Sequence, residues 1–178
     1  GSLLELIQAY VPILEKGVQG ATPLGLHLEG PFLNPEKKGA FNPSWLRLPD
    51  PVEARKYLDL GRGWIKQITI APELPQAVEV AAILRQGGVT VALGHSNADF
   101  ETASQALRGD FTHITHSFNA QSGFSHRAPG VFGAVLASDQ VTGELIADGV
   151  HVHPGAMKVL LRCLGTDRIV LITDAIPG

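Results

Sequence analysis

The sequence predicts an α/β fold in which parallel strands alternate with helices, of the kind that builds a (β/α)8 TIM barrel. Two observations predict it. Short apolar runs recur along the chain, separated by loops rich in glycine, proline or polar residues and by segments with a helical pattern. Side chains that can bind a metal also follow the ends of several of these runs. Because the carboxyl ends of parallel barrel strands open onto one face, we expect these side chains to converge there.

Six apolar runs are expected as strands, and five segments of helical pattern as helices. The strands are predicted at 23–28, 66–71, 89–93, 112–115, 143–147 and 168–173. The helices are predicted at 3–17, 52–60, 74–86, 99–107 and 154–164. Asp99 suits a helix N-cap, with Thr102 in the first turn, and Pro154 suits a first helical position. The sequence therefore predicts about six β-α units.

The composition is that of a chain that forms an apolar core. Of its 178 residues, 44% are hydrophobic and 17% charged, and the formal net charge is -3. The absence of a long basic run argues against nucleic acid as a partner. Cys163 is the only cysteine, which excludes an intramolecular disulfide and a zinc site built from cysteines. Because no apolar stretch reaches about 18 residues and no signal pattern opens the chain, we expect no membrane partner and a cytoplasmic location.

Three residues at predicted strand ends form a set suited to a divalent metal. Glu29, His95 and His116 supply one carboxylate and two imidazoles, and three protein ligands leave a position open for water, as in catalytic zinc sites. Asp174, at the last strand end, is placed to take a proton from water and pass it to a leaving amine. A single histidine after a strand is more often a capping or core residue, so the residues by themselves also allow a purely structural interpretation.

Six motifs in order along the chain extend this pattern. They are His27-Leu-Glu-Gly-Pro-Phe, Gly94-His-Ser, Thr115-His-Ser-Phe-Asn-Ala120, Arg127-Ala-Pro-Gly, Asp148-Gly-Val-His-Val-His-Pro154 and Thr173-Asp-Ala. Any one of them is weak, because a histidine or aspartate at a strand end is widespread among metal-dependent barrels. Together they resemble the N-acetylglucosamine-6-phosphate deacetylases, a family of the amidohydrolase superfamily. The resemblance runs from near Leu24 to the C-terminus and covers roughly the middle of the family's chain.

The resemblance implies a metal-dependent hydrolase that converts N-acetylglucosamine 6-phosphate into glucosamine 6-phosphate and acetate. Glu29, His95 and His116 would be the metal ligands, and Asp174 the general base and later the general acid. Zinc is the first choice of metal, while Fe²⁺, Co²⁺ and Mn²⁺ accept the same donors.

The resemblance also implies a set of residues that bind the amino-sugar phosphate. Asn119 and the backbone at Ala120 would contact the substrate, and His151 the sugar. Arg127 would bind the phosphate, for which its planar fork of donors is suited. Relatives are often dimers, so we expect a homo-oligomer in which a neighbouring subunit can supply Arg127.

The chain departs from the family pattern in two respects. Phe41 stands where relatives usually have a histidine that helps to position or polarise the substrate. The chain is also shorter than the about 250 residues of a complete barrel, and we expect residues 1–178 to be a partial metal-dependent amidohydrolase barrel domain. We expect this chain to lack the first barrel strands and the β-sandwich that the two chain ends build in the family. Two unpaired sheet edges and exposed apolar barrel residues would result.

Two other functions stay open at this point. The first is a related amidohydrolase that acts on another N-acyl sugar or a cyclic amide, which Phe41 favours. The second is a catalytically inactive remnant that oligomerises through its open sheet edges. Bound metal and turnover distinguish the inactive remnant from an enzyme. A panel of acyl sugars with and without the phosphate distinguishes the related amidohydrolase from a deacetylase of N-acetylglucosamine 6-phosphate.

Overall fold

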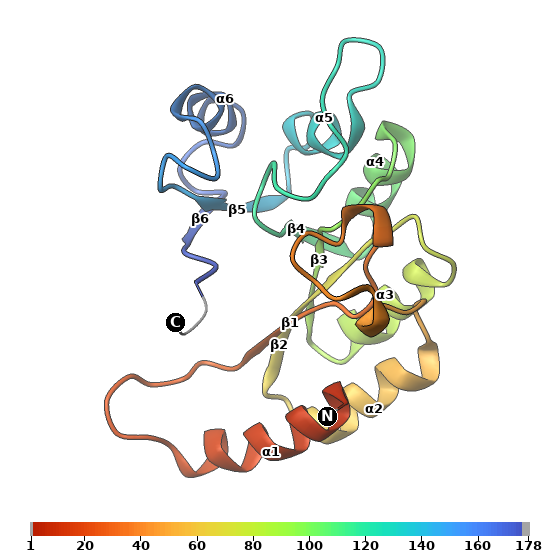
Figure 1. Ribbon diagram of the computed structural model, residues 1–178, viewed down its shortest axis with the longest axis vertical. Coiled ribbons are helices and arrows are strands. Elements are labelled where there is room, and N and C mark those ends of the chain that lie inside the picture. Colours follow the sequence, from red (N-terminus) through yellow and green to blue (C-terminus); the bar gives the residue numbers. More distant parts are fainter. Residues whose placement is uncertain (1, 176–178) are drawn as a thin grey trace.

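The computed structural model describes residues 2–175, and within them six strands form one parallel sheet. Each strand pairs with the next in chain order, and the sheet curls as the wall of a barrel does (Figure 1). The strands are β1 (Leu26–Glu29), β2 (Ile65–Ile70), β3 (Thr90–Leu93), β4 (Phe111–Ile114), β5 (Thr142–Ile146) and β6 (Ile169–Ile172). This is the strand order of a partial TIM barrel, and every strand overlaps one of the predicted runs.

Helices connect the strands and pack against one another outside the sheet. They are α1 (Leu3–Lys16), α2 (Pro51–Gly61), α3 (Ala77–Gln86), α4 (Phe100–Arg108), α5 (Gly130–Leu136) and α6 (Pro154–Leu164). Within this series, α1 packs against α2, α2 against α3 and α4 against α5. Two short 3-10 helices, Pro35–Lys37 and Pro43–Trp45, lie in the long loop between β1 and α2.

Local sequence signals fix where two of these helices begin. The Asp99 carboxylate accepts a hydrogen bond from the Thr102 N–H at 2.8 Å, which confirms the predicted N-cap of α4. Pro154 is the first residue of α6, as predicted, and the ring of His153 accepts a hydrogen bond from the Gly155 N–H at 3.0 Å. Donors that have no partner within the helix are thereby satisfied.

The apolar core lies between the sheet and the helices. Its most deeply buried side chains come from both layers and include Ile68, Leu84, Val91, Ile114 and Leu160, each 0% exposed. Burying a side chain of this size contributes about 1.5–3 kcal/mol, so this layer holds the strands in their register.

The face of the sheet that points into the barrel is polar near the carboxyl ends of the strands. Thr69, His113 and Glu144 are buried there. Their polar atoms form hydrogen bonds with one another and with neighbouring side chains. The Gln67 side chain donates to Glu144 Oε1 at 2.8 Å, and the hydroxyls of Thr69 and Thr115 lie 2.7 Å apart. Buried polar groups of this kind are tolerated because they are hydrogen-bonded.

Three details of the fold differ from the sequence prediction. β1 begins at Leu26 instead of residue 23, because Gly25 has a φ of 149° that leaves the strand conformation. α3 begins at Ala77 instead of residue 74, because Gln76 adopts a left-handed φ of 63° that a helix interior excludes. α5 was not predicted, since it has only seven residues, includes two glycines and has no side-chain cap.

β1 and β6 are the two edges of the sheet, and each pairs on one side only within residues 2–175. On β6, Val170 is 45% exposed and Leu171 71% exposed.

Among the helices that the structure describes, none is both long and apolar enough to cross a membrane.

Candidate metal centre

Glu29, His95 and His116 come together at the carboxyl ends of their strands. Glu29 is the last residue of β1, while His95 and His116 follow β3 and β4. The Oε1 atom of Glu29 lies 2.7 Å from Nε2 of His95 and 2.9 Å from Nε2 of His116. The two Nε2 atoms are 3.0 Å apart. Ligands bound to one zinc ion at about 2.0–2.2 Å stand at comparable separations, so the spacing suits a single ion.

The protonation of His95 also suits a metal. Its Nδ1 lies 2.7 Å from the carbonyl oxygen of Lys37. Because a carbonyl oxygen only accepts, Nδ1 carries the proton, and in the neutral ring Nε2 presents a lone pair to the cluster. Metal-bound histidines are held in this way through the other ring nitrogen. The donor set and its spacing therefore fit one divalent ion of the zinc type.

The backbone reaches these positions through conformations that are rare for residues with a Cβ. φ is 48° at His95, 26° at His116 and 52° at Asp174, each just beyond a strand. Non-glycine residues in this region cost of order 1–3 kcal/mol and are concentrated at functional sites. Gly94, before His95, is packed closely, since a Cβ there would lie 2.7 Å from Thr69 Cγ2. Turning the chain sharply at the strand ends is what directs the two imidazoles at Glu29.

The electrostatics of the cluster favour a cation. His95 and His116 are each 4% exposed. Burial raises the pKa of Glu29, but the rings of His116 and His95 beside its carboxylate, when protonated, outweigh it and hold that pKa well below its ordinary range. Burial lowers the pKa of His116, while the hydrogen bond to Glu29 and the negative charges of Glu29 and Asp174 raise it more. A proton or a metal ion is therefore needed among these three ligand atoms.

Two of the predicted substrate residues lie on the turn that follows His116. The Asn119 side chain donates to the carbonyl oxygens of Ser117 at 3.3 Å and of His116 at 3.4 Å. The carbonyl oxygen of Ala120, whose φ is 50°, accepts from the N–H of Ser96 at 3.1 Å. These contacts join the turn after β4 to the turn after β3 and keep Asn119 and Ala120 beside the cluster.

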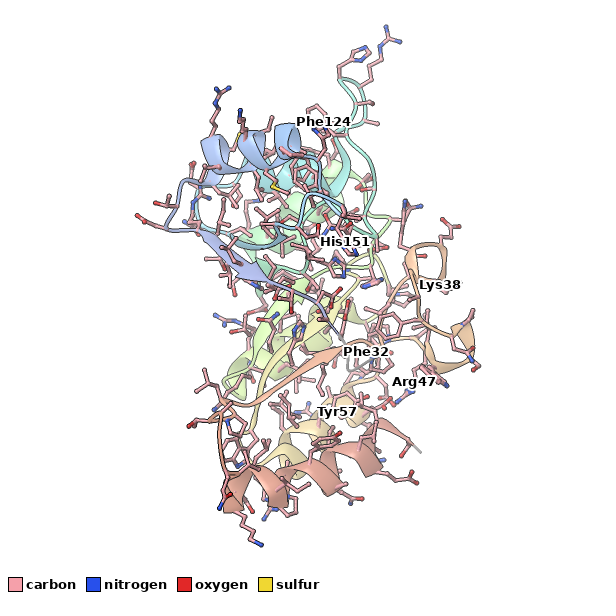
Figure 2. The ribbon with its side chains drawn as sticks, turned by 60° about the vertical axis from the view of Figure 1, so that its left-hand side comes forward. Phe32, Lys38, Arg47, Tyr57, Phe124 and His151 are labelled. Atoms are coloured by element: carbon pink, nitrogen blue, oxygen red, sulfur yellow. The ribbon has the colours of Figure 1, made fainter. Side chains whose placement is uncertain are left out.

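The other two predicted substrate residues are exposed. Nδ1 of His151 lies 2.6 Å from the Asp148 carboxylate, which also accepts from the backbone N–H of His151. These hydrogen bonds lower the pKa of Asp148 to about 2 and orient the His151 ring. Arg127 lies on the loop before α5 and has no hydrogen bond or ion pair with another described residue. In Figure 2, Phe124 of the same loop lies in the upper part of the molecule and Tyr57 in the lower part.

Phe41 borders a cavity that reaches the cluster at Glu29, and Asp174 borders a separate open hollow. The ring of Phe41 meets the ring of His95 edge-on, with 5.3 Å between their centroids. Together with Glu29 it lines a cavity of about 460 Å³ whose walls are mostly apolar. Asp174, at an exposed position, lines an open hollow of about 590 Å³ with His27 and Leu171. The phenylalanine therefore lies against a proposed metal ligand.

Sequence reasoning missed two carboxylates that hold this region together. Glu144 Oε2 accepts the backbone N–H of His116 at 3.1 Å. Burial raises the pKa of Glu144, but hydrogen bonds from His113, Gln67 and the His116 backbone outweigh it and lower that pKa to about 2. The signal for Glu144 is a charged residue inside an apolar run at 143–147.

The second missed carboxylate is Glu73, which joins the loops after β1 and β3. It accepts from the Ser96 hydroxyl at 2.7 Å, from the Asn97 N–H at 2.6 Å and from the Asn34 side chain at 2.9 Å. No residue pattern in the sequence singled it out, because its partners lie on two segments that are far from Glu73 and from each other in the sequence.

A parallel barrel wall that carries one glutamate and two histidines at its strand ends defines the class as that of the metal-dependent amidohydrolase barrels. Comparison with known proteins then gives the family. The chain is homologous over about nine tenths of its length to the N-acetylglucosamine-6-phosphate deacetylases.

The supporting similarities come from sequences and from solved structures. The chain is 41% identical over 161 residues to N-acetylglucosamine-6-phosphate deacetylase of Bacillus subtilis, covering 90% of the chain and 41% of that protein. It is 38% identical over 161 residues to N-acetylgalactosamine-6-phosphate deacetylase of Escherichia coli O157:H7, covering 90% of the chain and 42% of that protein. The crystal structure of the N-acetyl-D-glucosamine-6-phosphate deacetylase of Mycobacterium smegmatis matches with a TM-score of 0.92 at 37% identity, covering 98% of the chain and 45% of that structure.

No protein-family model matches the chain. The chain spans about two fifths of the length of the curated relatives that it matches.

Proposed function

We propose that this chain provides the metal centre of an amide hydrolase that removes the acetyl group from N-acetylglucosamine 6-phosphate. The products would be glucosamine 6-phosphate and acetate. The observation that carries the proposal is the cluster in which Glu29 Oε1 and the Nε2 atoms of His95 and His116 lie within 3.0 Å of one another. The names of the relatives support the substrate class.

Glu29, His95 and His116 would hold the metal, with zinc as the first choice and Fe²⁺, Co²⁺ or Mn²⁺ as other ions that accept these donors. When bound, such an ion lowers the pKa of a water molecule and polarises a carbonyl oxygen. The proton on His95 Nδ1, held by the Lys37 carbonyl, keeps Nε2 available as a donor atom. Both histidine side chains are buried, while the Glu29 side chain is partly exposed and lines the cavity beside Phe41.

Asp174 would move the proton in the hydrolysis. The oxygen of a water molecule bonds to the amide carbonyl carbon, the C–N bond breaks, and the proton released by water passes through the Asp174 carboxylate to the leaving nitrogen. The exposed position of Asp174 after β6, beside the hollow that it lines with Leu171, supports this role. So does its negative charge, which raises the pKa of His116 and so acts on the cluster.

Asn119, the backbone at Ala120 and His151 would contact the sugar, and Arg127 its phosphate. The hydrogen bonds that keep Asn119 and Ala120 beside His116 support the first two assignments. Arg127, on an exposed loop, would reach the substrate from a neighbouring subunit of a homodimer. The dimer and the cytoplasmic location stay predictions from the sequence.

A second candidate substrate is N-acetylgalactosamine 6-phosphate. The 38% identity to a deacetylase named for that sugar supports it, since the two substrates share the acetyl group and the phosphate. Phe41, which lies against His95, would take the place of the histidine that the resemblance to the family leads us to expect there.

Metal content per chain, measured by plasma mass spectrometry, tests the metal centre. We expect about one transition metal per wild-type chain and none in a His95→Ala, His116→Ala double variant. His126→Ala is the matched control, because His126 is exposed on the loop that carries Arg127, and it should keep the metal. Equal metal content in the double variant and the control would refute the assignment.

Deacetylation assays on the two sugar phosphates then separate the candidate substrates. Loss of turnover in Asp174→Asn with metal retained would support the proton role of Asp174, whereas near-normal turnover would remove it from the reaction. Metal binding without turnover on either sugar would favour the inactive remnant.

A further inference from the structure

We propose that Glu144 is a positioning residue for the metal centre, acting through the backbone of His116. Glu144 lies on β5 and is 5% exposed. Its Oε2 atom accepts the N–H of His116 at 3.1 Å, and its main-chain carbonyl accepts the N–H of Ser117 at 2.8 Å. One residue therefore holds two successive amides of the turn that carries a proposed ligand. The inference rests on the proposed function insofar as it assigns His116 to the metal.

The turn after β4 needs this support because the regular pairing of β4 with β5 has already ended there. The pairing of β4 with β5 ends at Ile114 and Gly143, two residues before His116. There His116 adopts a φ of 26°, a conformation that persists only where the surroundings determine it. The Glu144 carboxylate meets the first N–H that the ladder leaves free near this bend.

The imidazole of His116 also lacks the support that His95 has. Nδ1 of His95 is fixed by the Lys37 carbonyl at 2.7 Å. Nδ1 of His116 is buried and has no hydrogen-bond partner among the described residues. The orientation of the His116 ring therefore depends on where its backbone is held, and that is the contact which Glu144 makes.

The carboxylate of Glu144 is itself held from two further strands. Gln67 of β2 donates to Oε1 at 2.8 Å, and Nε2 of His113 on β4 donates to the same atom at 3.1 Å. Burying a carboxylate destabilises the fold unless the charge is paired, and an apolar side chain of similar size would fill this space without that cost. What the charge provides here is a strong acceptor for the His116 N–H.

The test compares zinc affinity in variants of the full 178-residue chain, measured by competition with a chromophoric chelator. Glu144→Leu removes the acceptor and should raise the Kd for zinc by about 10–100-fold, as loss of a group that supports a metal ligand does. Glu144→Gln keeps one oxygen and should restore part of the affinity. Thr142→Val is the matched control, because Thr142 binds Nδ1 of His113 at 2.6 Å without touching His116.

The control separates positioning from a merely structural role. Thr142→Val should lower the urea midpoint and leave the zinc Kd and the visible spectrum of bound Co²⁺ unchanged, whereas Glu144→Leu should change both. A Kd in Glu144→Leu equal to that of Thr142→Val overturns the role of Glu144 while leaving the metal centre in place. A wild-type chain that binds no zinc overturns the proposed function and this role with it. If Glu144→Leu does not fold, the same comparison of Kd is decided by Glu144→Gln.

Discussion

Replacing Gly94 by alanine probes the close packing behind the metal ligands. A Cβ at Gly94 would lie 2.7 Å from Thr69 Cγ2 and 2.8 Å from Thr115 Cβ, nearer than Cβ atoms approach in real structures. Both neighbours lie on the polar face of the sheet, where their hydroxyls are 2.7 Å apart. Neither can retreat without moving its strand, so we expect the cost of overpacking a filled site, about 1–3 kcal/mol.

The assay is urea denaturation of Gly94→Ala beside the matched variant Gly123→Ala, whose Cβ would meet nothing within 4 Å. Both alanines reduce the freedom of the unfolded chain and gain about 0.4–1 kcal/mol from it, so the difference between them isolates the packing cost. Zinc affinity should also fall in Gly94→Ala, because His95 and Thr115 adjoin the added methyl group. Free energies of unfolding that agree within about 0.5 kcal/mol would refute the tight packing.

Three further predictions concern the metal, the phosphate and pH. Zinc at 100 times its Kd should raise the free energy of unfolding by about 2.7 kcal/mol in the wild type and not in His95→Ala, as thermal or urea unfolding would measure. Arg127→Ala in the assembled enzyme should raise KM for the phosphorylated sugar far more than for the unphosphorylated one, and equal effects in steady-state kinetics would contradict the phosphate assignment. Hydrogen bonds from Arg47 hold the pKa of Glu53 below its ordinary value of 4.5. The charge of Glu53 therefore stabilises the fold above that value and loses its effect as the pH falls through the lowered pKa. Glu53→Gln should be less stable than the wild type at pH 7 and equally stable in acid, and a stability difference that is independent of pH would be evidence against this coupling.

The sequence was sufficient to predict the strands and the place where the cluster lies. Apolar runs bounded by turn residues marked all six strands, and parallel topology puts their carboxyl ends on one face. That geometry alone brings Glu29, His95 and His116 together, although 66 and 87 residues separate the glutamate from the two histidines. Pattern reasoning works here because each proposed ligand lies at the end of its strand or two residues beyond it.

Contacts that depend on side-chain direction could not be predicted in the same way. Glu144 interrupts an apolar run, but only the three-dimensional structure shows that its carboxylate meets the His116 N–H. The left-handed backbone at His95, His116 and Asp174 could not be predicted from residue type, because histidine and aspartate adopt this conformation more often than most residues but still rarely. α5 was not predicted because its seven residues are too few to show a helical period.

The separation of the ligands along the chain has a consequence for folding kinetics. Glu29 and His116 meet only where β1, β3 and β4 are all in place, so the site depends on contacts between residues that are distant in the sequence, and such contacts slow folding. An ion bound there would join residues 29 and 116 as a cross-link does and close a long loop, which restricts the unfolded chain most when the loop is large. Release of the ion would then be slow in the intact barrel wall and rapid once β1 detaches, so the rate at which a chelator removes it would report the opening of that edge strand.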